Sequence, residues 1–183
     1  MRWVRSVVAQ EQAKCSRAGV AFDRAMPVGA MVEVPSLAFA LAEASRDLDF
    51  FSIGTNDLLQ YFTAVDRANR KVAVLYNPVQ PAFLRLLHKI VGEAHAAGRW
   101  VGLCGEMGGQ LRSLPLLVGL GLDEISMAAP LIGPARAALA SLCSADCAHL
   151  VQQALACAAA SEVEQLLPNS RRADPLRSST RTW

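Results

Sequence analysis

Residues 49–61 constrain the fold more than any other stretch of this sequence. They read Asp-Phe-Phe-Ser-Ile-Gly-Thr-Asn-Asp-Leu-Leu-Gln-Tyr, an apolar run that passes into a polar loop and then into a helical pattern. Buried parallel strands are short continuous apolar runs, and in α/β folds polar loops follow their carboxyl ends. The stretch therefore predicts a parallel strand that delivers polar side chains to one edge of a sheet.

The same alternation of strand and helix recurs along the chain. A helix at 2–18 comes first, and 66–80 forms a long polar loop. Strands are predicted at 28–34, 49–53, 100–104 and 124–127, and further helices at 37–46, from Leu58, and at 81–97, 111–119, 134–142, 145–157 and 161–167. Such alternation predicts a parallel sheet with helical crossovers. We expect an α/β fold of about four βα units with C-terminal helices, a partial TIM (β/α)8 barrel.

Composition predicts one folded unit followed by a tail. The chain has 183 residues, 52% of them hydrophobic, which is enough for one core, so we expect a single domain over 1–167. Residues 168–183 carry four arginines against one aspartate and are expected to be a disordered basic tail. The sequence has no basic patch with interleaved aromatic residues, so nucleic acid is not expected as a partner. Five cysteines without CxxC spacing, and no apolar run long enough to span a bilayer, favour a cytoplasmic protein without membrane insertion.

Two carboxylates are expected at the carboxyl ends of neighbouring strands. Glu33 ends the first strand, and Asp57 follows the second. Together they form a hard-oxygen pair suited to Mg²⁺, which takes one or two protein carboxylates and completes its shell with water and phosphate. Glu33 could instead pair with a neighbouring Arg or Lys, and Asp57 could be the N-cap of the helix that starts at Leu58. Spacing alone leaves both alternatives open.

Two further residues could contact an anion. Asn56 lies in a helix-entry loop whose free backbone N–H groups can receive a phosphate. Arg67, ten residues after Asp57, could bind a phosphate through two parallel hydrogen bonds. A lone arginine at this position could equally be an ordinary surface residue.

Cys104 is the candidate for proton transfer. It ends the third strand between Gly102 and Gly105, so another chemical group can approach it closely. It could be an inert buried thiol, or a proton donor aimed at the same edge, with Glu106 as the competing candidate. The three histidines, His88, His95 and His149, have no motif context and are interpreted as packing or solvent-facing.

Several of these segments together resemble the phosphoenolpyruvate-utilising enzymes, and most closely enzyme I of the bacterial sugar phosphotransferase system. The similarity rests on Met-Val-Glu-Val-Pro-Ser (31–36), the stretch at 49–61, Ala-Val-Asp-Arg (64–67), Leu-Tyr-Asn-Pro-Val-Gln-Pro (75–81) and Trp-Val-Gly-Leu-Cys-Gly-Glu-Met (100–107). Pyruvate phosphate dikinase and phosphoenolpyruvate synthase share the Gly-Thr-Asn-Asp and Cys-Gly-Glu pieces, so a relative of those enzymes is an alternative.

The resemblance implies a TIM barrel that binds phosphoenolpyruvate and Mg²⁺ at its carboxyl face. Glu33 and Asp57 match the metal-binding carboxylates, and Asn56 and Arg67 match groups that contact the substrate phosphate. Cys104 matches the proton donor to the enolate carbon. The family transfers the phosphoryl group to a histidine of its own N-terminal domain and then to the phosphocarrier protein HPr.

The chain also departs from the family. The histidine domain and the substrate arginines of the first barrel strands are missing, and Gln110 stands where the family has an acidic residue. We therefore expect the second half of a barrel, which carries half of the site and is inactive alone. The alternative is a non-catalytic interaction or dimerisation module, because a half-barrel leaves sheet edges and apolar faces for a homodimer or a partner half-barrel to cover.

Overall fold

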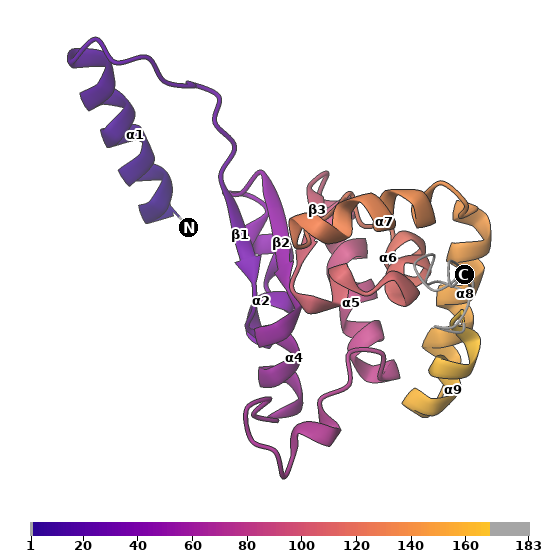
Figure 1. Cartoon of the computed structure of the whole chain (residues 1–183). Coiled ribbons are helices and arrows are strands. Elements are labelled where there is room, and N and C mark those ends of the chain that lie inside the picture. The colour runs from indigo at the N-terminus through magenta and orange to yellow at the C-terminus, as the bar shows by residue number, and fades with distance from the viewer. Residues whose placement is uncertain (1, 169–183) are drawn as a thin grey trace, which may run out of the picture.

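The computed structural model describes residues 2–168, and a parallel sheet lies at its centre (Figure 1). Its strands follow one another in sequence order, and each pairs in parallel with the next. They are β1 (Gly29–Val32), β2 (Phe50–Gly54), β3 (Trp100–Cys104) and β4 (Glu124–Ile125). The predicted α/β class with parallel strands is confirmed. Within residues 2–168 the sheet is open and does not close into a barrel.

Helices connect the strands and continue beyond the last one. α1 (Arg2–Arg17) precedes the sheet, and the connecting helices are α2 (Pro35–Ala38), α3 (Leu41–Ala44), α4 (Thr55–Thr63), α5 (Pro81–Ala96) and α6 (Leu114–Gly119). The predicted C-terminal helices are present as α7 (Ala129–Leu139), α8 (Ser144–Ala156) and α9 (Ala160–Leu166). Single 3-10 turns occur at η1 (Ala73–Leu75), η2 (Glu106–Gly109) and η3 (Leu111–Ser113).

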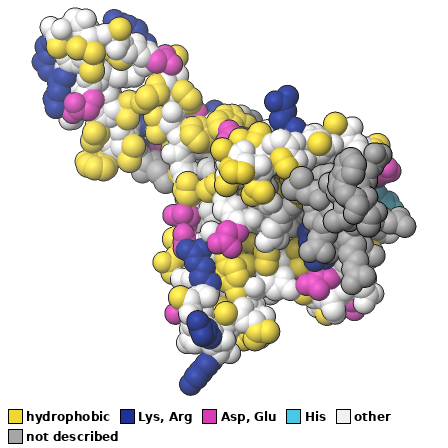
Figure 2. All heavy atoms as spheres, viewed as in Figure 1, with side chains coloured by type: hydrophobic (Ala, Val, Ile, Leu, Met, Phe, Trp, Pro, Cys, Tyr) yellow, Lys and Arg dark blue, Asp and Glu magenta, His cyan; other side chains and the backbone are white. Residues whose placement is uncertain are grey.

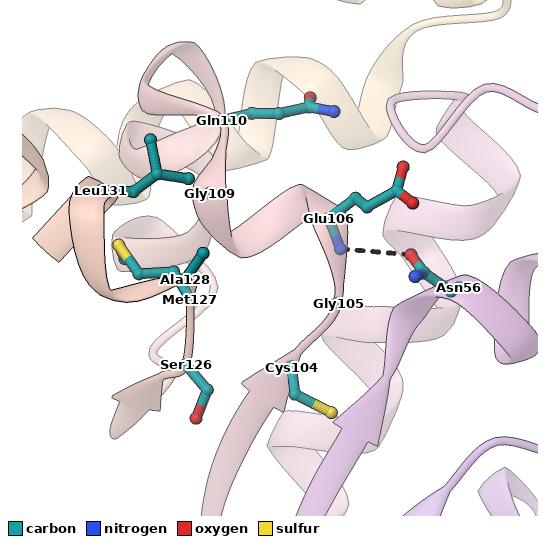
Figure 3. Close-up of a pocket in the computed structure, with 10 residues that line it drawn as sticks. All are labelled: Asn56, Cys104, Gly105, Glu106, Gly109, Gln110, Ser126, Met127, Ala128 and Leu131. Atoms are coloured by element: carbon teal, nitrogen blue, oxygen red, sulfur yellow. Dashed lines mark hydrogen bonds between the residues drawn. The ribbon is translucent and has the colours of Figure 1, made fainter.

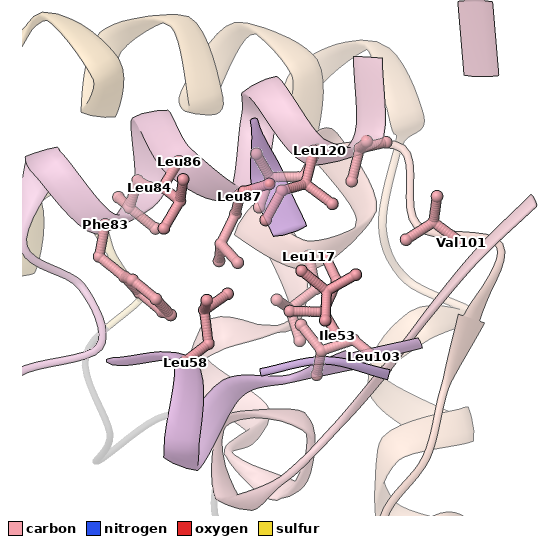
Figure 4. Packing of buried hydrophobic residues seen from close by; sticks show 14 of the residues in the cluster. Ile53, Leu58, Phe83, Leu84, Leu86, Leu87, Val101, Leu103, Leu117 and Leu120 are labelled. Atoms are coloured by element: carbon pink, nitrogen blue, oxygen red, sulfur yellow. The ribbon is translucent and has the colours of Figure 1, made fainter. Parts of the chain in front are cut away.

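The hydrophobic core lies between one face of the sheet and the helices packed on it (Figure 4). Because successive strand residues point to opposite faces, Phe51 and Ile53 of β2 and Leu103 of β3 all point into this core, where they are buried. The apolar stripe of α5 packs against them through Phe83, Leu84, Leu87 and Ile90. This packing fixes the strands and, with them, the positions of the loops at their carboxyl ends.

The other face of the sheet is more accessible. Ser52 and Cys104 are half-buried there, and Met31 is 47% exposed. At the amino end of this face the rings of Phe50 and Trp100 stack with centroids 4.3 Å apart. The accessible face is therefore apolar at its amino end and carries polar and sulfur-bearing side chains toward its carboxyl end.

The first helix, α1, contributes no buried residue and projects from the body of the chain, away from the sheet (Figure 1, Figure 2). Arg5 ties it to the body of the chain, since its guanidinium donates to the Asp47 carbonyl and to the Asp49 carboxylate. Trp3 on the same helix is 75% exposed. The attachment of α1 thus depends on polar contacts at one end of the helix.

Several predicted boundaries were wrong. The helix expected at 37–46 is two short turns, α2 and α3, because the backbone of Ala40 leaves the helical region between them. α4 begins at Thr55 and not at Leu58, so Gly54 occupies the N-cap position and Asp57 lies within the first turn. α7 begins at Ala129 and tolerates Pro134 inside it, although the prediction placed the start near that proline. β4 is shorter than the predicted 124–127.

The tail expected at 168–183 lies outside the described residues except for Pro168, which is exposed. In the part of the chain that is described, no helix combines the length and the hydropathy needed to cross a membrane.

Candidate functional site

The predicted site residues of the strands gather at the carboxyl edge of the sheet. Glu33 follows β1, and its side chain lies over the end of β2. A Cβ atom added to Gly54 would come within 2.6 Å of the Glu33 Cγ and 2.8 Å of its Oε1. The register that pairs Val32 with Ile53 produces this overlap. Gly54 is therefore the residue that lets the Glu33 carboxylate reach across the neighbouring strand.

The loops after β2 and β3 are fastened to each other. The Thr55 hydroxyl donates to the Cys104 carbonyl at 2.9 Å, and the Asn56 Oδ1 accepts a hydrogen bond from the Glu106 backbone N–H at 3.2 Å (Figure 3). Gly105 makes this possible with a φ of 111°, which side-chain-bearing residues rarely adopt. Because its oxygen is taken by a backbone donor, the Asn56 amide nitrogen is the group left for another partner.

Asp57 and Arg67 form an ion pair, with 3.5 Å between the Asp57 Oδ1 and an Arg67 terminal nitrogen. Both side chains are about two-fifths exposed, so this pair alone is worth little to stability. The Arg67 backbone N–H also donates to the Gln60 side chain at 3.4 Å. Arg67 therefore lies beside Asp57 at the carboxyl edge of the sheet. The position of α4 excludes the alternative that Asp57 is its N-cap.

Tyr76, which the sequence analysis did not single out, lies beside Asn56 at the same edge of the sheet. Its hydroxyl donates to the Asn56 carbonyl at 3.0 Å. Burial raises the pKa of Tyr76; the nearby Arg67 guanidinium opposes that rise, while the carboxylates of Glu106 and Asp57 add to it. These influences show that the two carboxylates, the guanidinium and the phenol share one electrostatic environment.

Cys104 faces the accessible side of the sheet in a row that crosses three strands. The Ser52 hydroxyl donates to the Cys104 sulfur at 3.9 Å, and that thiol lies 4.0 Å from the Met31 sulfur. The thiol is half-buried rather than enclosed in the core. A half-buried thiol on the accessible face favours a group available to a ligand over an inert buried thiol.

A cavity of about 660 Å³ opens beside this row, at the ends of β3 and β4 (Figure 3). Asn56, Cys104 and Glu106 form one side of it, and Gln110 and Ser126 contribute polar groups from the other. The sequence reasoning missed Ser126. A signal for it exists, because Leu-Asp-Phe-Phe-Ser at 48–52 recurs as Leu-Asp-Glu-Ile-Ser at 122–126.

Comparison with known protein families identifies the family of this chain. The family model described as PEP-utilising enzyme, PEP-binding domain matches residues 1–144. The chain belongs to this family. The resemblance to the phosphoenolpyruvate-utilising enzymes is thereby confirmed.

Individual relatives agree with the PEP-binding domain assignment. The chain is 48% identical over 169 residues to Multiphosphoryl transfer protein 2 of Escherichia coli (strain K12), an alignment that covers 92% of the chain and 20% of that protein. It is 44% identical over 162 residues to the Phosphoenolpyruvate-protein phosphotransferase of Geobacillus stearothermophilus and 43% identical over 159 residues to that of Bacillus subtilis (strain 168). These alignments cover 88% and 87% of the chain, and 28% of each relative. The chain thus spans between a fifth and a third of the relatives it matches.

The carboxylates of this PEP-binding domain suit Mg²⁺ better than a metal with an all-protein shell. Among residues 2–168 no group of three or more His, Cys, Asp and Glu side chains is placed to hold a metal ion. Glu33 also forms no ion pair with the residues described, so the alternative of a paired rim carboxylate is not observed there. Two carboxylates that leave room for water and phosphate are the donor set that Mg²⁺ prefers.

Gln110 and His95 form polar contacts within the fold, and the other two histidines are exposed. Gln110 occupies the N-cap position of η3, and its Oε1 accepts a hydrogen bond from the Ser113 hydroxyl at 3.4 Å. His88 and His149 are exposed, as expected. His95 instead pairs with the Asp123 carboxylate at 2.8 Å. None of the three histidines lines the cavity.

Proposed function

We propose that this PEP-binding domain supplies the metal- and phosphate-binding corner of a site that transfers a phosphoryl group from phosphoenolpyruvate to a protein histidine. The observation that carries the proposal is the convergence of Glu33, Asp57 and Arg67 at one edge of the sheet, where Gly54 pairs with Cys104. Phosphoryl transfer needs positioning and charge neutralisation more than covalent help from the protein. Two carboxylates for a metal ion and one guanidinium for a phosphate provide that combination.

Glu33 and Asp57 are the residues that would hold Mg²⁺. The ion, when bound, neutralises charge on the phosphoryl oxygens as a Lewis acid. Asp57 has a second role, because its carboxylate already contacts the Arg67 guanidinium and keeps it at the same edge. Arg67 can then donate two parallel hydrogen bonds to phosphate oxygens. The Asn56 amide nitrogen can donate a third, since the Asn56 oxygen is occupied by the Glu106 N–H.

Cys104 completes the reaction on the carbon side. As the bond between the enol oxygen and phosphorus breaks and a phosphorus–nitrogen bond forms on the acceptor histidine, the enolate of pyruvate remains. The Cys104 thiol gives its proton to the methylene carbon, which yields pyruvate and a thiolate. The Ser52 hydroxyl, which already donates toward this sulfur, can stabilise the thiolate until it regains a proton from solvent.

The acceptor has to come from another domain or protein, because none of the chain's histidines lines the cavity. In the proposed setting it is a histidine domain that passes the phosphoryl group to the phosphocarrier protein HPr. We therefore expect the isolated chain to bind phosphoenolpyruvate weakly in the presence of Mg²⁺ and to release no pyruvate. The relatives are named as a multiphosphoryl transfer protein and as phosphoenolpyruvate-protein phosphotransferases, which favours this function over that of a dikinase or synthase relative.

The test combines a binding and a turnover measurement on the purified chain. Isothermal titration with phosphoenolpyruvate should show a signal that requires Mg²⁺ and that Glu33→Gln and Asp57→Asn each reduce about tenfold or more. Glu43→Gln, an exposed carboxylate on α3, is the control and should leave binding unchanged. A pyruvate assay with Mg²⁺, phosphoenolpyruvate and HPr should stay at background. Binding that is independent of Mg²⁺ would contradict the assignment of the carboxylates, and substantial turnover would contradict inactivity.

The open sheet favours a second candidate function, association with another subunit. Within residues 2–168, β1 and β4 each pair on one side only, and the accessible sheet face exposes Met31 and Trp100. A homodimer or a partner half-barrel would cover these groups. Light scattering on the purified chain tests this, and a monomer with a cooperative melt would argue against association.

A further inference from the structure

A second cavity, of about 380 Å³, lies where η3 and α6 pack against α7 (Figure 1). This space, hereafter the Arg112 cavity, is lined by Arg112, Leu114 and Pro115 from η3 and α6, and by Pro134, Ala137 and Leu142 from α7 and the chain just after it. It shares none of its lining residues with the cavity beside Cys104. A concave space of this size with mostly apolar walls is typical of small-molecule sites.

Arg112 supplies the charge of this cavity and is half-buried. Its Nε is buried and donates no hydrogen bond. Among residues 2–168 no carboxylate forms an ion pair with it. A buried N–H without a partner is costly, because the water it loses is not replaced by another acceptor. An unpartnered guanidinium N–H at the wall of an apolar cavity therefore indicates a place for an acceptor that comes from outside the fold.

The walls keep the cavity open in the absence of a ligand. Pro115 lies in the first turn of α6, and Pro134 lies inside α7. A proline ring is joined to its own backbone, so it cannot rotate to fill the space between the helices. Ser141 is the other polar side chain among the described lining residues, and its hydroxyl already donates to the Ala138 carbonyl at 2.7 Å. The Arg112 guanidinium is therefore the side-chain donor that remains for a ligand.

The charge of the cavity selects the chemical class of that ligand. A carboxylate carries one negative charge and can accept parallel hydrogen bonds from the guanidinium of Arg112. A phosphate dianion carries more charge than one guanidinium can neutralise away from water. An amino acid would find no acidic side chain for its ammonium group among the described lining residues. Leucine, alanine and proline walls without an aromatic ring favour a compact aliphatic body over a flat, stacking one.

We propose that the Arg112 cavity is a second ligand site of this chain, which binds a small aliphatic monocarboxylate through the Arg112 guanidinium. It differs from the corner formed by Glu33, Asp57 and Arg67 in position and in charge, since that corner combines carboxylates with a cation. The second site does not depend on the proposed function, and its test requires neither Mg²⁺ nor phosphoenolpyruvate.

The probe is 4-methylpentanoate, and 4-methylpentanamide is its uncharged counterpart of nearly the same shape. Nuclear magnetic resonance of chain labelled with ¹⁵N-arginine follows the Nε–H signal of Arg112, which Arg112→Gln identifies by removing it. We expect the acid to shift this signal with a dissociation constant on the order of 1 mM or below. The amide should bind about tenfold or more weakly, because it lacks the charge that the guanidinium requires. Equal binding of acid and amide, or no binding of the acid up to about 10 mM, overturns the proposal.

Variants test the location by isothermal titration with the same acid. Arg112→Gln should weaken binding about tenfold or more. Arg136→Gln is the matched control, because Arg136 is an exposed arginine of α7 that does not line this cavity, and it should leave binding unchanged. Arg67→Ala should also leave it unchanged, and a loss in that variant would place the acid in the other site and overturn the proposal.

A second cavity variant keeps the test decisive should Arg112→Gln fail to fold. Ala137 is an exposed residue of α7 that lines the cavity, so Ala137→Leu fills the space, keeps the guanidinium and retains a good helix former. Thermal melts should show this variant folded, and it should bind the acid about tenfold or more weakly than the parent chain. Parent-like affinity in a folded Ala137→Leu variant overturns the proposal.

Discussion

The carboxylate of Asp123 joins His95, at the last turn of α5, to the sheet. Its Oδ2 lies 2.8 Å from the His95 Nε2 and accepts the Val101 N–H at 2.8 Å. Asp49, at the equivalent place before β2, accepts the Val28 N–H at 2.7 Å and pairs with Arg5. The repeated Leu-Asp pattern at 48–52 and 122–126 therefore marks a shared arrangement, in which an aspartate before a strand binds the backbone of the neighbouring strand and one basic side chain.

The Asp123 contacts predict a loss of stability in acid. Burial raises the pKa of this carboxyl, but the Val101 N–H and His95 together hold it below its ordinary value of 3.8. A folded-state pKa below the unfolded one stabilises the fold above pH 3.8, and this contribution is lost as the pH falls through the folded value. Urea unfolding between pH 7 and pH 2 should show that loss. Asp123→Asn should reduce the free energy of unfolding at neutral pH by about 0.5–1 kcal/mol and flatten the acid dependence, whereas an equally steep acid loss in this variant would refute the assignment.

Gly54→Ala is predicted to impair ligand binding far more than folding. The φ of Gly54 is −82°, which alanine adopts without strain, but the added Cβ would meet the Glu33 side chain. Glu33 must then move away from the end of β2. We expect phosphoenolpyruvate affinity with Mg²⁺ to fall about tenfold or more while the melting temperature changes little. The control is Gly92→Ala in α5, where an added Cβ meets nothing within 4 Å; it should leave binding intact and stabilise the chain by about 0.5–1 kcal/mol.

Cys104→Ser is predicted to abolish proton transfer without abolishing binding. By microscopic reversibility, a thiol that protonates enolpyruvate also exchanges the methyl protons of bound pyruvate with solvent. This exchange needs neither phosphoryl transfer nor an acceptor histidine, so we expect the chain to catalyse it in D₂O with Mg²⁺ although it releases no pyruvate from phosphoenolpyruvate. Proton resonance follows the exchange, and Cys104→Ser should slow it about 10²-fold. Cys143→Ser, at an exposed cysteine, should exchange at the parent rate. If the Cys104 variant keeps that rate, Glu106 becomes the donor to examine.

Arg85 is predicted to stabilise the attachment of the C-terminal helices. Its guanidinium donates to the Leu155 carbonyl at 2.9 Å and to the Cys157 carbonyl at 2.8 Å, where α8 ends. Truncation leaves these carbonyls without their charged donor at a helix C-terminus. Arg85→Ala should lower the free energy of unfolding by about 1–3 kcal/mol in urea. His88→Ala, at an exposed position of the same helix, should change it by less than about 0.5 kcal/mol.

Local sequence patterns located the central elements because those elements follow from local physics. The apolar run of β2 and the stripe of α5 are continuous, and Pro81 begins that helix as predicted. Boundaries failed where the local signal was ambiguous. Thr55 to Asp57 resembles a loop in composition yet forms the first turn of α4, and Pro134 resembles a helix start yet lies inside α7.

The sequence by itself determined the α/β class, the order of the strands and the polar residue types at their carboxyl ends, because burial periodicity and turn chemistry act over a few residues. Only the tertiary structure decided which of those side chains meet. Strand register places Glu33 across Gly54, the fold of residues 64–80 brings the Arg67 guanidinium to Asp57, and Tyr76 reaches Asn56 from twenty residues away. These contacts depend on how separate elements pack, and no local pattern encodes that packing.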